Sequence, residues 1–384
     1  MTHINIKEIL WKLHIDSLTA MQQTTVEEYR KGKDLVLLSP TGSGKTIAYL
    51  LPLVLSLKNE NVLQAVVLVP SRELALQIEQ VFKSMGTGIP VMSCYGGRPA
   101  MDEHRTMKSL NPQVIVGTPG RMNDHLNKGN IDASHVHTLV IDEFDKCLEM
   151  GFQEEMSEVI AQIPYLKRRF LLSATDAPAI PRFVSEGDFL KLNFLEDEEQ
   201  IPERIKVYTV KSPEKDKLEV LSKLLCYLGD KSSLVFVNYR ESVERVYRYL
   251  LQEGISCEMF HGGMEQKDRE RALYKFSNGS CNVFVSTDLA ARGLDIPNID
   301  HVIHYHLPLN EDAYIHRNGR TARWDASGNV FLILGPEEYL PEFIQQIPED
   351  YVWEGPKPDP AKPQWVTLYI GKGKKDKINK VDIV

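Results

Sequence analysis

The chain has 384 residues, which suggests about two domains at roughly 150 residues each. An apolar content of 42% is enough for full cores, and a charged content of 26% is ordinary for a soluble protein. The net charge of −8 excludes a globally basic nucleic-acid binder, so any such binding has to come from local basic faces.

The N-terminal residues MTHINIKEILWKL are amphipathic and mixed in charge, which argues against a signal peptide. No apolar run approaches the roughly 20 residues that span a bilayer. The five cysteines are odd in number, scattered and without metal-ligand spacing. We therefore expect reduced thiols in a cytoplasmic protein with no membrane partner.

The segment Leu35–Thr46, LVLLSPTGSGKT, is the motif around which most of the other predicted site residues are organised. Four apolar residues predict a buried parallel strand, a glycine-bearing loop follows, and an apolar helix begins at Thr46. The loop N–H groups, the helix N-terminus and the Lys45 ammonium would bind phosphates, and the Thr46 hydroxyl would bind Mg²⁺. Ser39 stands where this pattern usually has glycine, and the competing interpretation is a glycine-rich turn without a ligand. The predicted nucleotide contacts in the loop are Thr41, Gly42, Ser43, Gly44, Lys45 and Thr46.

Short apolar runs then alternate with helical patterns, and each run ends in polar or turn residues, as strands do when their carboxyl ends carry a site. The expected strands are Ala65–Pro70, Val114–Pro119, Thr138–Asp145 and Phe170–Thr175. A serine cap and apolar residues at helical spacing predict a helix over Ser71–Phe82. Together these patterns predict a doubly wound parallel α/β domain over residues 1–195.

Residues 196–203 are acidic and contain proline, which predicts a linker. A second series of strands and helices predicts another α/β domain over residues 204–345, without a GKT loop. Its expected strands are Lys206–Val210, Leu234–Asn238, Cys257–His261, Val283–Asp288, His301–His306 and Val330–Leu334. Two α/β units with one phosphate loop suggest that the second completes the site from across a cleft.

Residues 346–384 predict a proline-rich spacer and a short basic tail. Residues 364–370 have the pattern of a strand, and residues 362–384 carry six lysines against two aspartates. A lone strand cannot bury a face. Either this strand pairs with the core or the given chain ends early.

Two further groups have the chemistry of a nucleotide site. Asp142 and Glu143 end an apolar strand, where one carboxylate can hold Mg²⁺ and its neighbour can position water, although such pairs often only cap a helix. The segment His316–Arg323 holds three arginines. Arg320 and Arg323 would share one helix face and could reach one phosphate, and the alternative is a solvated basic helix.

From about residue 15 to residue 335 the chain resembles the DEAD-box ATP-dependent RNA helicases, with their motifs in the expected order. The motifs are Gln22, SPTGSGKT (39–46), PSREL (70–74), Gly96-Gly97, TPGR (118–121), DEFD (142–145), SAT (173–175), LVFVN (234–238), QKDR (266–269), STDLAARGLD (286–295) and HRNGRTAR (316–323). The resemblance implies two tandem RecA-like domains, ATP and Mg²⁺ as cofactors, and a monomer that hydrolyses ATP on RNA and locally unwinds short duplexes.

The resemblance also implies roles for single residues. At the nucleotide it implies adenine recognition by Gln22, phosphate binding by Lys45, magnesium binding by Thr46 and Asp142, water activation by Glu143, ribose contact by Asp295 and arginine-finger action by Arg320 and Arg323. The residues implied to couple hydrolysis to domain closure are Asp145, Ser173 and Thr175. The implied RNA contacts are Pro70, Arg72, Gly97, Thr118, Gly120, Arg121, Gln266, Arg269, Thr287 and Asp288. Backbone contacts of this kind do not read base sequence.

The chain departs from the family pattern at several positions. Phe144 replaces the alanine of the name motif, and we expect the chemistry to survive with altered packing. The prolines usual before Gln22 and an aromatic residue about 17 positions upstream are absent, which weakens the expectation of adenine selectivity. Ala322 and Trp324 replace a glycine and an alanine, which would change how Arg323 points. Because of these departures, a second hypothesis stays open, in which the chain is an ATP-gated RNA clamp that unwinds little RNA.

A DNA translocase of related architecture is a third hypothesis, which the PSREL, DEFD and HRNGRTAR motifs disfavour. Residues 366–384 are similar to the opening strand and basic turn of the RNA-binding module in DbpA-type DEAD-box proteins. This second resemblance implies a truncated module, a hairpin of large-subunit ribosomal RNA as target and a role in ribosome assembly. The alternative is a solvated basic tail.

Overall fold

The computed structural model describes residues 5–40, 42–97, 99–175, 180–184, 188–195, 205–289, 299–321, 328–344, 346–353 and 355–368. The backbone groups into two compact units. The first comprises Met1–Lys206, Ala290–Asp295 and Leu309–Gly328, and the second comprises Val207–Leu289, Ile296–Pro308 and Asn329–Val384. The domain boundaries at 195 and 345 stay predictions, and the predicted linker lies outside the described residues.

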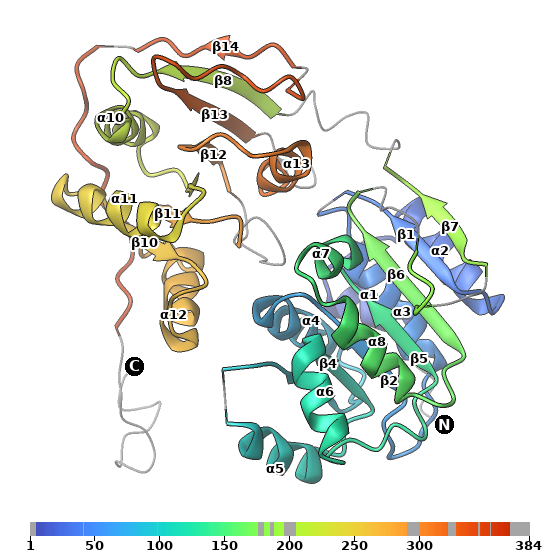
Figure 1. Ribbon diagram of the computed structural model, residues 1–384. Helices are drawn as coiled ribbons and strands as arrows, with labels where there is room; N and C mark the ends of the chain where they lie inside the picture. The colour runs from blue at the N-terminus through green and yellow to red at the C-terminus, as the bar shows by residue number, and fades with distance from the viewer. Residues whose placement is uncertain are drawn as a thin grey trace, which may run out of the picture. The chain divides into compact units, whose positions relative to one another are not determined.

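The first unit contains a seven-stranded sheet in the order β3-β4-β2-β5-β6-β1-β7, in which every neighbouring pair is parallel (Figure 1). Its strands are β1 Leu35–Leu38, β2 Ala65–Leu68, β3 Val91–Cys94, β4 Val114–Gly117, β5 Thr138–Ile141, β6 Arg168–Ser173 and β7 Leu190–Asn193. Its first eight helices are α1 Ile6–Lys12, α2 Ala20–Arg30, α3 Lys45–Ser56, α4 Arg72–Ser84, α5 Ala100–Leu110, α6 Pro119–Asn127, α7 Phe144–Glu149 and α8 Gln153–Ala161.

Apolar side chains on both faces of this sheet explain its near-continuous hydrophobic strands. In β1, Leu35 and Leu37 belong to one core cluster, which they share with α1 to α4. Val36 and Leu38 belong to a second cluster, which contains buried residues of α5 to α8. The doubly wound arrangement predicted from the sequence is therefore confirmed.

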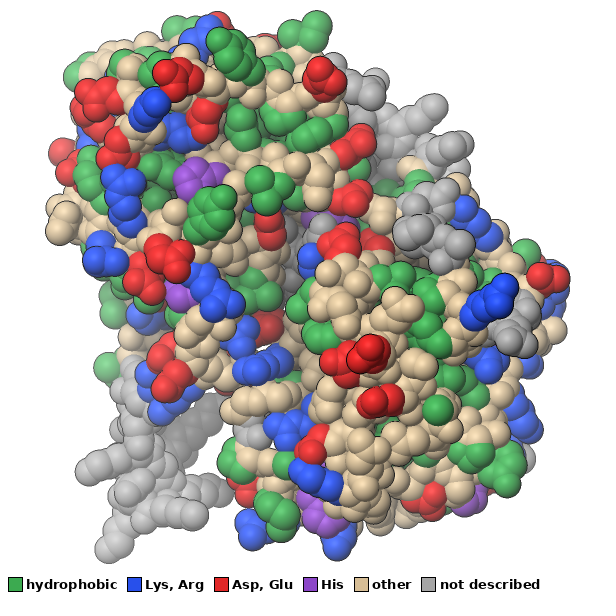
Figure 2. Space-filling view, in the orientation of Figure 1, with side chains coloured by type: hydrophobic (Ala, Val, Ile, Leu, Met, Phe, Trp, Pro, Cys, Tyr) green, Lys and Arg blue, Asp and Glu red, His purple; other side chains and the backbone are tan. Residues whose placement is uncertain are grey.

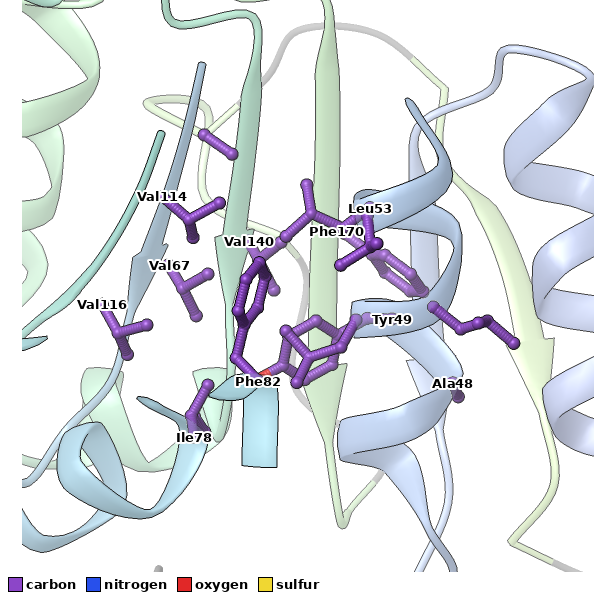
Figure 3. Packing of buried hydrophobic residues seen from close by; sticks show 14 of the residues in the cluster. Ala48, Tyr49, Leu53, Val67, Ile78, Phe82, Val114, Val116, Val140 and Phe170 are labelled. Atoms are coloured by element: carbon purple, nitrogen blue, oxygen red, sulfur yellow. The ribbon is translucent and has the colours of Figure 1, made fainter. Parts of the chain in front are cut away.

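Helix α3 packs against the sheet through its aromatic and aliphatic side chains. Figure 3 shows Tyr49 and Leu53 reaching from α3 toward Phe170 and Val140 on the strands. The rings of Tyr49 and Phe170 meet edge to face, with centroids 6.3 Å apart, and both are almost completely buried. This packing fixes the position of the helix that begins at Lys45.

The second sheet also has seven strands, in the order β10-β11-β9-β12-β13-β8-β14. Its strands are β8 Ile205–Lys211, β9 Ser233–Phe236, β10 Cys257–Phe260, β11 Val283–Ser286, β12 His301–His304, β13 Gly328–Leu334 and β14 Glu349–Asp350. The described helices from residue 205 onward are α10 Leu218–Leu228, α11 Arg240–Gln252, α12 Gln266–Ser277 and α13 Glu311–Asn318. The prediction of two tandem RecA-like domains is thus confirmed, although β3, β7 and β14 were not predicted.

The segment after β14 is extended but attached to the second unit. Lys223 lies over the Trp353 ring, 4.4 Å from its centroid, and Lys357 Nζ lies 2.8 Å from Glu253. The predicted strand at 364–370 is not formed over its described part, 364–368, where Thr367 instead bonds to side chains of the α12–β11 turn. The basic tail lies outside the described residues, and no described helix is long and apolar enough to cross a membrane.

Replacement of Phe170 by alanine tests the packing of α3 on the sheet. Phe170 touches both Tyr29 and Tyr49, so we expect a loss of about 3–5 kcal/mol in the free energy of unfolding of the first unit, measured by urea denaturation. The control Tyr165→Ala removes a side chain that is 63% exposed and should cost less than about 0.5 kcal/mol. Equal costs for the two variants would contradict this core position.

Candidate nucleotide and RNA site

The carboxyl ends of the parallel strands lie at one edge of the first sheet, and the predicted site residues of this unit follow those ends. The phosphate loop follows β1, Pro70 and Arg72 follow β2, and the glycine pair follows β3. Thr118, Asp142 and Thr175 follow β4, β5 and β6 in the same way. Parallel topology thereby gathers segments that are more than 100 residues apart in the sequence.

Glycines allow the phosphate loop its backbone conformation. Gly42 and Gly44 have φ angles of 89° and 90°, in the left-handed region that other residues rarely adopt, and α3 begins directly after Gly44. Ser39 donates from its hydroxyl to Ser43 at 2.6 Å, and the Ser43 hydroxyl also lies 2.8 Å from the Pro40 carbonyl oxygen. The serine that replaces the usual glycine therefore braces the loop.

Lys45 lies at the N-terminus of α3 with its ammonium turned toward the loop. Its Nζ donates to the carbonyl oxygens of Ser39 and Pro40, the latter at 2.8 Å. Burial lowers the pKa of Lys45, and the negative charges of Asp142 and Glu143 partly offset this effect. A flexible cation beside a helix N-terminus and glycine N–H groups fits a bound polyphosphate.

Asp142 and Glu143 form an acidic pair at the end of β5, in which Asp142 is buried and Glu143 is half-buried. Burial raises the pKa of Asp142 to about 6, and the Lys45 charge opposes this shift. Burial, followed by the charge of Asp142, raises the pKa of Glu143 to about 7. Among the described residues Glu143 Oε2 is buried without a hydrogen-bond partner, so the pair fits a bound cation and an ordered water.

Glu143 has φ 50° and ψ 50°, a left-handed conformation that is strained for a residue with a Cβ. Its N–H donates to Asp142 Oδ1 at 2.9 Å, and its carbonyl accepts from the N–H of Cys147 within α7. Phe144 is the first residue of α7, and its side chain is buried in the core with Cys147 and Met156. The phenylalanine thus packs in the core, while the two acids lie at the sheet edge.

A hydrogen-bond network connects the acidic segment to the end of β6. Asp145 Oδ2 accepts from the Thr175 hydroxyl at 2.9 Å. Ser173 Oγ donates to the Thr175 carbonyl at 2.6 Å and accepts from the Thr175 N–H at 3.1 Å. Ser173 also bonds through its carbonyl to the N–H of Ser39 in the phosphate loop. The three residues predicted to couple hydrolysis to closure are therefore brought together with that loop.

Gln22 is 1% exposed and connects helix α2 to the phosphate loop. Its Oε1 accepts from the Thr19 N–H at 3.0 Å in a capping box, and its Nε2 donates to the Gly44 carbonyl at 3.2 Å. The predicted contact with adenine stays a prediction. The bond to Gly44 was not predicted, because capping chemistry in the sequence identifies the helix start and not a partner 22 residues away.

Two predicted RNA-binding loops of the first unit touch each other. The Arg72 guanidinium packs so closely over Gly96 and Gly97 that a side chain at Gly97 would collide with it. On the neighbouring α6, Arg121 Nε lies 3.5 Å from the carboxylate of Glu103. That carboxylate also accepts from the N–H of Tyr95 at 3.1 Å, so Glu103 connects Arg121 to the segment that precedes Gly96 and Gly97.

Glu103 also belongs to a buried cluster with Cys94 and His125 that has the residue types of a metal site. However, His125 Nε2 lies 2.9 Å from Glu103, and His125 Nδ1 lies 3.1 Å from the amide nitrogen of Asn130. The amide N–H donates to Nδ1, so Nε2 carries the proton and donates to Glu103. Protein partners occupy these ligand atoms, which identifies the cluster as a structural hydrogen-bond network.

The predicted RNA contacts in the second unit lie at the start of α12 and after β11. Arg269 Nη2 donates to Gln266 Oε1 at 2.7 Å, and the Arg269 guanidinium lies 6.0 Å from the centroid of the Phe260 ring. Thr287 and Asp288 directly follow β11, beside β10 in the sheet. Acidic and basic side chains are interspersed over both units on the face shown in Figure 2, consistent with local rather than global positive charge.

The structure describes only some of the remaining predicted residues. Arg320 follows α13 and is 2% exposed. Thr41, Asp295 and Arg323 lie outside the described residues, as do Ala322 and Trp324. Tyr49, which the sequence analysis did not single out, lies four residues after Lys45 on the same helix face and carries a buried hydroxyl near Asp142.

A phosphate loop and paired strand-end acids on a doubly wound parallel sheet define a P-loop nucleotide-binding protein. The DEAD/DEAH box helicase model matches residues 19–181, and the helicase conserved C-terminal domain model matches residues 216–325. The chain belongs to the DEAD/DEAH box helicase family, as its motifs indicated.

Curated relatives and solved structures agree with this assignment. The ATP-dependent RNA helicase CshA of Listeria monocytogenes is 36% identical over 335 residues, which cover 85% of this chain and 64% of that protein. CshA of Geobacillus kaustophilus is 33% identical and covers 87% of this chain and 72% of its own length. Saccharomyces cerevisiae Dbp5 bound to RNA and ADP BeF3 superposes with a TM-score of 0.77 at 27% identity, covering 86% of this chain and 88% of the chain in that structure. DEAD-box helicase Mss116 bound to ssRNA and UDP-BeF gives 0.78 at 25% identity, covering 88% and 73%.

The raised pKa of Glu143 predicts a pH dependence of stability. Its pKa rises from 4.5 to about 7 on folding. The resulting stabilisation is complete below pH 4.5 and is lost as the pH rises through about 7. In EDTA without nucleotide, the unfolding free energy of the wild type should fall between about pH 5 and pH 8. Glu143→Gln should make this fall smaller by up to about 3 kcal/mol. The measurement is urea denaturation across this pH range.

Glu149→Gln is the matched control, because Glu149 ends the short helix that Glu143 precedes and is 42% exposed in its pair with Lys146. It should leave the pH dependence as it is in the wild type. If Glu143→Gln did the same, the carboxyl group would not be protonated in the folded state near neutral pH.

Proposed function

We propose that this chain is an RNA-dependent ATPase that uses ATP to unwind short RNA duplexes locally. The observation that carries the proposal is the convergence of Lys45, the Asp142–Glu143 pair and the Asp145–Thr175 bond at one sheet edge, in a member of the DEAD/DEAH box family. The ligands named for Dbp5 and Mss116, RNA with a nucleotide analogue, support RNA and ATP as ligands of this chain too.

The residues of the first unit have distinct parts in the proposed reaction. The N–H groups of residues 42–46 and the Lys45 ammonium bind the phosphates. Thr46 and Asp142 would hold Mg²⁺, which neutralises phosphate charge when bound. Glu143 orients the attacking water and accepts its proton, for which a pKa of about 7 is well matched near neutral pH.

Residues of the segments 290–295 and 309–328, which the backbone groups with the first unit, would supply the remaining parts. Arg320 and Arg323 would bring positive charge to the γ-phosphate, and Asp295 would contact the ribose. RNA phosphates would lie on Arg72, Gly97 and Arg121 of the first unit and on Gln266 and Arg269 of the second. The Asp145–Thr175–Ser173 network would transmit the state of the nucleotide to the loops that hold RNA. Resemblance of the tail to an RNA-binding module supports ribosomal RNA as the target.

RNA stimulation of ATP hydrolysis tests the central claim. We expect the steady-state rate of phosphate release to rise several-fold when single-stranded RNA is added. Lys45→Ala should lower the stimulated rate about 100-fold or more, because the phosphate charge loses its cation. Lys58→Ala, a change at a lysine that is 69% exposed, is the control and should hydrolyse ATP like the wild type. Equal wild-type rates with and without RNA would exclude an RNA-dependent ATPase.

A strand-displacement assay separates an unwinding enzyme from an ATP-gated clamp. A helicase should release the labelled strand of a short RNA duplex only with ATP and wild-type Lys45. A clamp would bind RNA in an ATP-dependent manner and release no strand. Stronger stimulation of hydrolysis by DNA than by RNA would instead favour a DNA translocase.

A further inference from the structure

Tyr49 is a completely buried side chain with a polar atom that the fold does not use. Its ring packs on Phe170 inside the first core cluster (Figure 3). Its hydroxyl is buried and, among the described residues, meets no partner with the geometry of a hydrogen bond. A phenylalanine would fill the same space without this cost, so the hydroxyl requires an explanation beyond packing.

The neighbourhood of the hydroxyl supplies that explanation. Tyr49 lies one helical turn after Lys45, on the same face of α3. The Asp142 carboxylate is the neighbour of the phenol and is near enough to interact with it both by charge and as an acceptor, although the approach falls short of hydrogen-bond geometry. Burial, followed by this neighbour, raises the pKa of Tyr49 above its usual range. The phenol O–H, a donor, thus faces the Asp142 carboxylate, an acceptor, without completing a hydrogen bond of good geometry with it.

We propose that Tyr49 is a positioning residue for the divalent-cation site: with the cation bound, its hydroxyl donates a hydrogen bond to the Asp142 carboxylate and holds it toward the metal. The assignment rests on the proposed function, because Asp142 is a metal ligand only if this chain binds a magnesium nucleotide. Hydrogen bonds to metal-binding carboxylates from a second layer of residues are common, and they orient the ligand.

Tyr49→Phe tests this role, because it removes one oxygen and retains the ring. In EDTA the variant should unfold at the same temperature as the wild type or at a higher one, since a buried unpaired hydroxyl is lost. With saturating ADP, the MgCl₂ concentration that gives half of the thermal stabilisation should rise about tenfold. The Mg²⁺ requirement of RNA-stimulated hydrolysis should rise in parallel, with kcat at saturating Mg²⁺ within about twofold of the wild type.

Tyr29→Phe is the matched control. Tyr29 also packs on Phe170, but its hydroxyl bonds to Ser56 at 3.1 Å and to Thr138 at 3.3 Å, away from Asp142. It should lower the unfolding temperature in EDTA and leave the Mg²⁺ dependence unchanged. The two tyrosine variants should therefore differ in both measurements.

Two results would overturn the assignment, and they are distinguishable. If Tyr49→Phe behaves like Tyr29→Phe, the hydroxyl is structural and the proposed function still stands. If the wild type shows no Mg²⁺-dependent stabilisation by ADP, both the nucleotide site and the role of Tyr49 are wrong.

Discussion

Burial of the two carboxylates at the end of β5 is the constraint on which the rest of the first unit depends. Asp142 is 4% exposed, and low dielectric surroundings penalise its charge and that of Glu143. Lys45 offsets part of this penalty, but its ammonium is held by two loop carbonyls. A bound cation and polyphosphate would therefore offset the remaining penalty on the two carboxylates.

This electrostatic penalty has a conformational counterpart. Gly42 and Gly44 adopt left-handed backbone angles at no steric cost, whereas Glu143 adopts them with a side chain. Packing in the core holds the backbone at these angles, because Phe144 and Cys147 anchor α7 on one face of the sheet and Tyr49 anchors α3 on the other. A well-packed scaffold thus maintains a costly geometry at the edge where a ligand would use it.

Much of the fold followed from local patterns, and the misses have local causes. Continuous apolar runs predicted β2, β4, β5 and β6 because strands buried on both faces have no polar alternation. The runs at β3 and β7 are short and include polar residues, VMSC and LKLN, and β14 has two residues. The strand pattern at 364–370 failed over its described part because side-chain bonds of Thr367, which no pattern reveals, hold that segment in another conformation.

The sequence by itself determined the loop chemistry, the acidic pair and the order of the motifs, because these depend on residue types at fixed spacing. Only the tertiary structure decided which of them meet. Parallel pairing of β5 with β6 brought Asp145 to Thr175, and the packing of α2 brought Gln22 to Gly44. The packing of α3 on the sheet also buried the Tyr49 hydroxyl beside Asp142. Residue spacing along the chain could not predict this contact, because it depends on how the helix lies against the sheet.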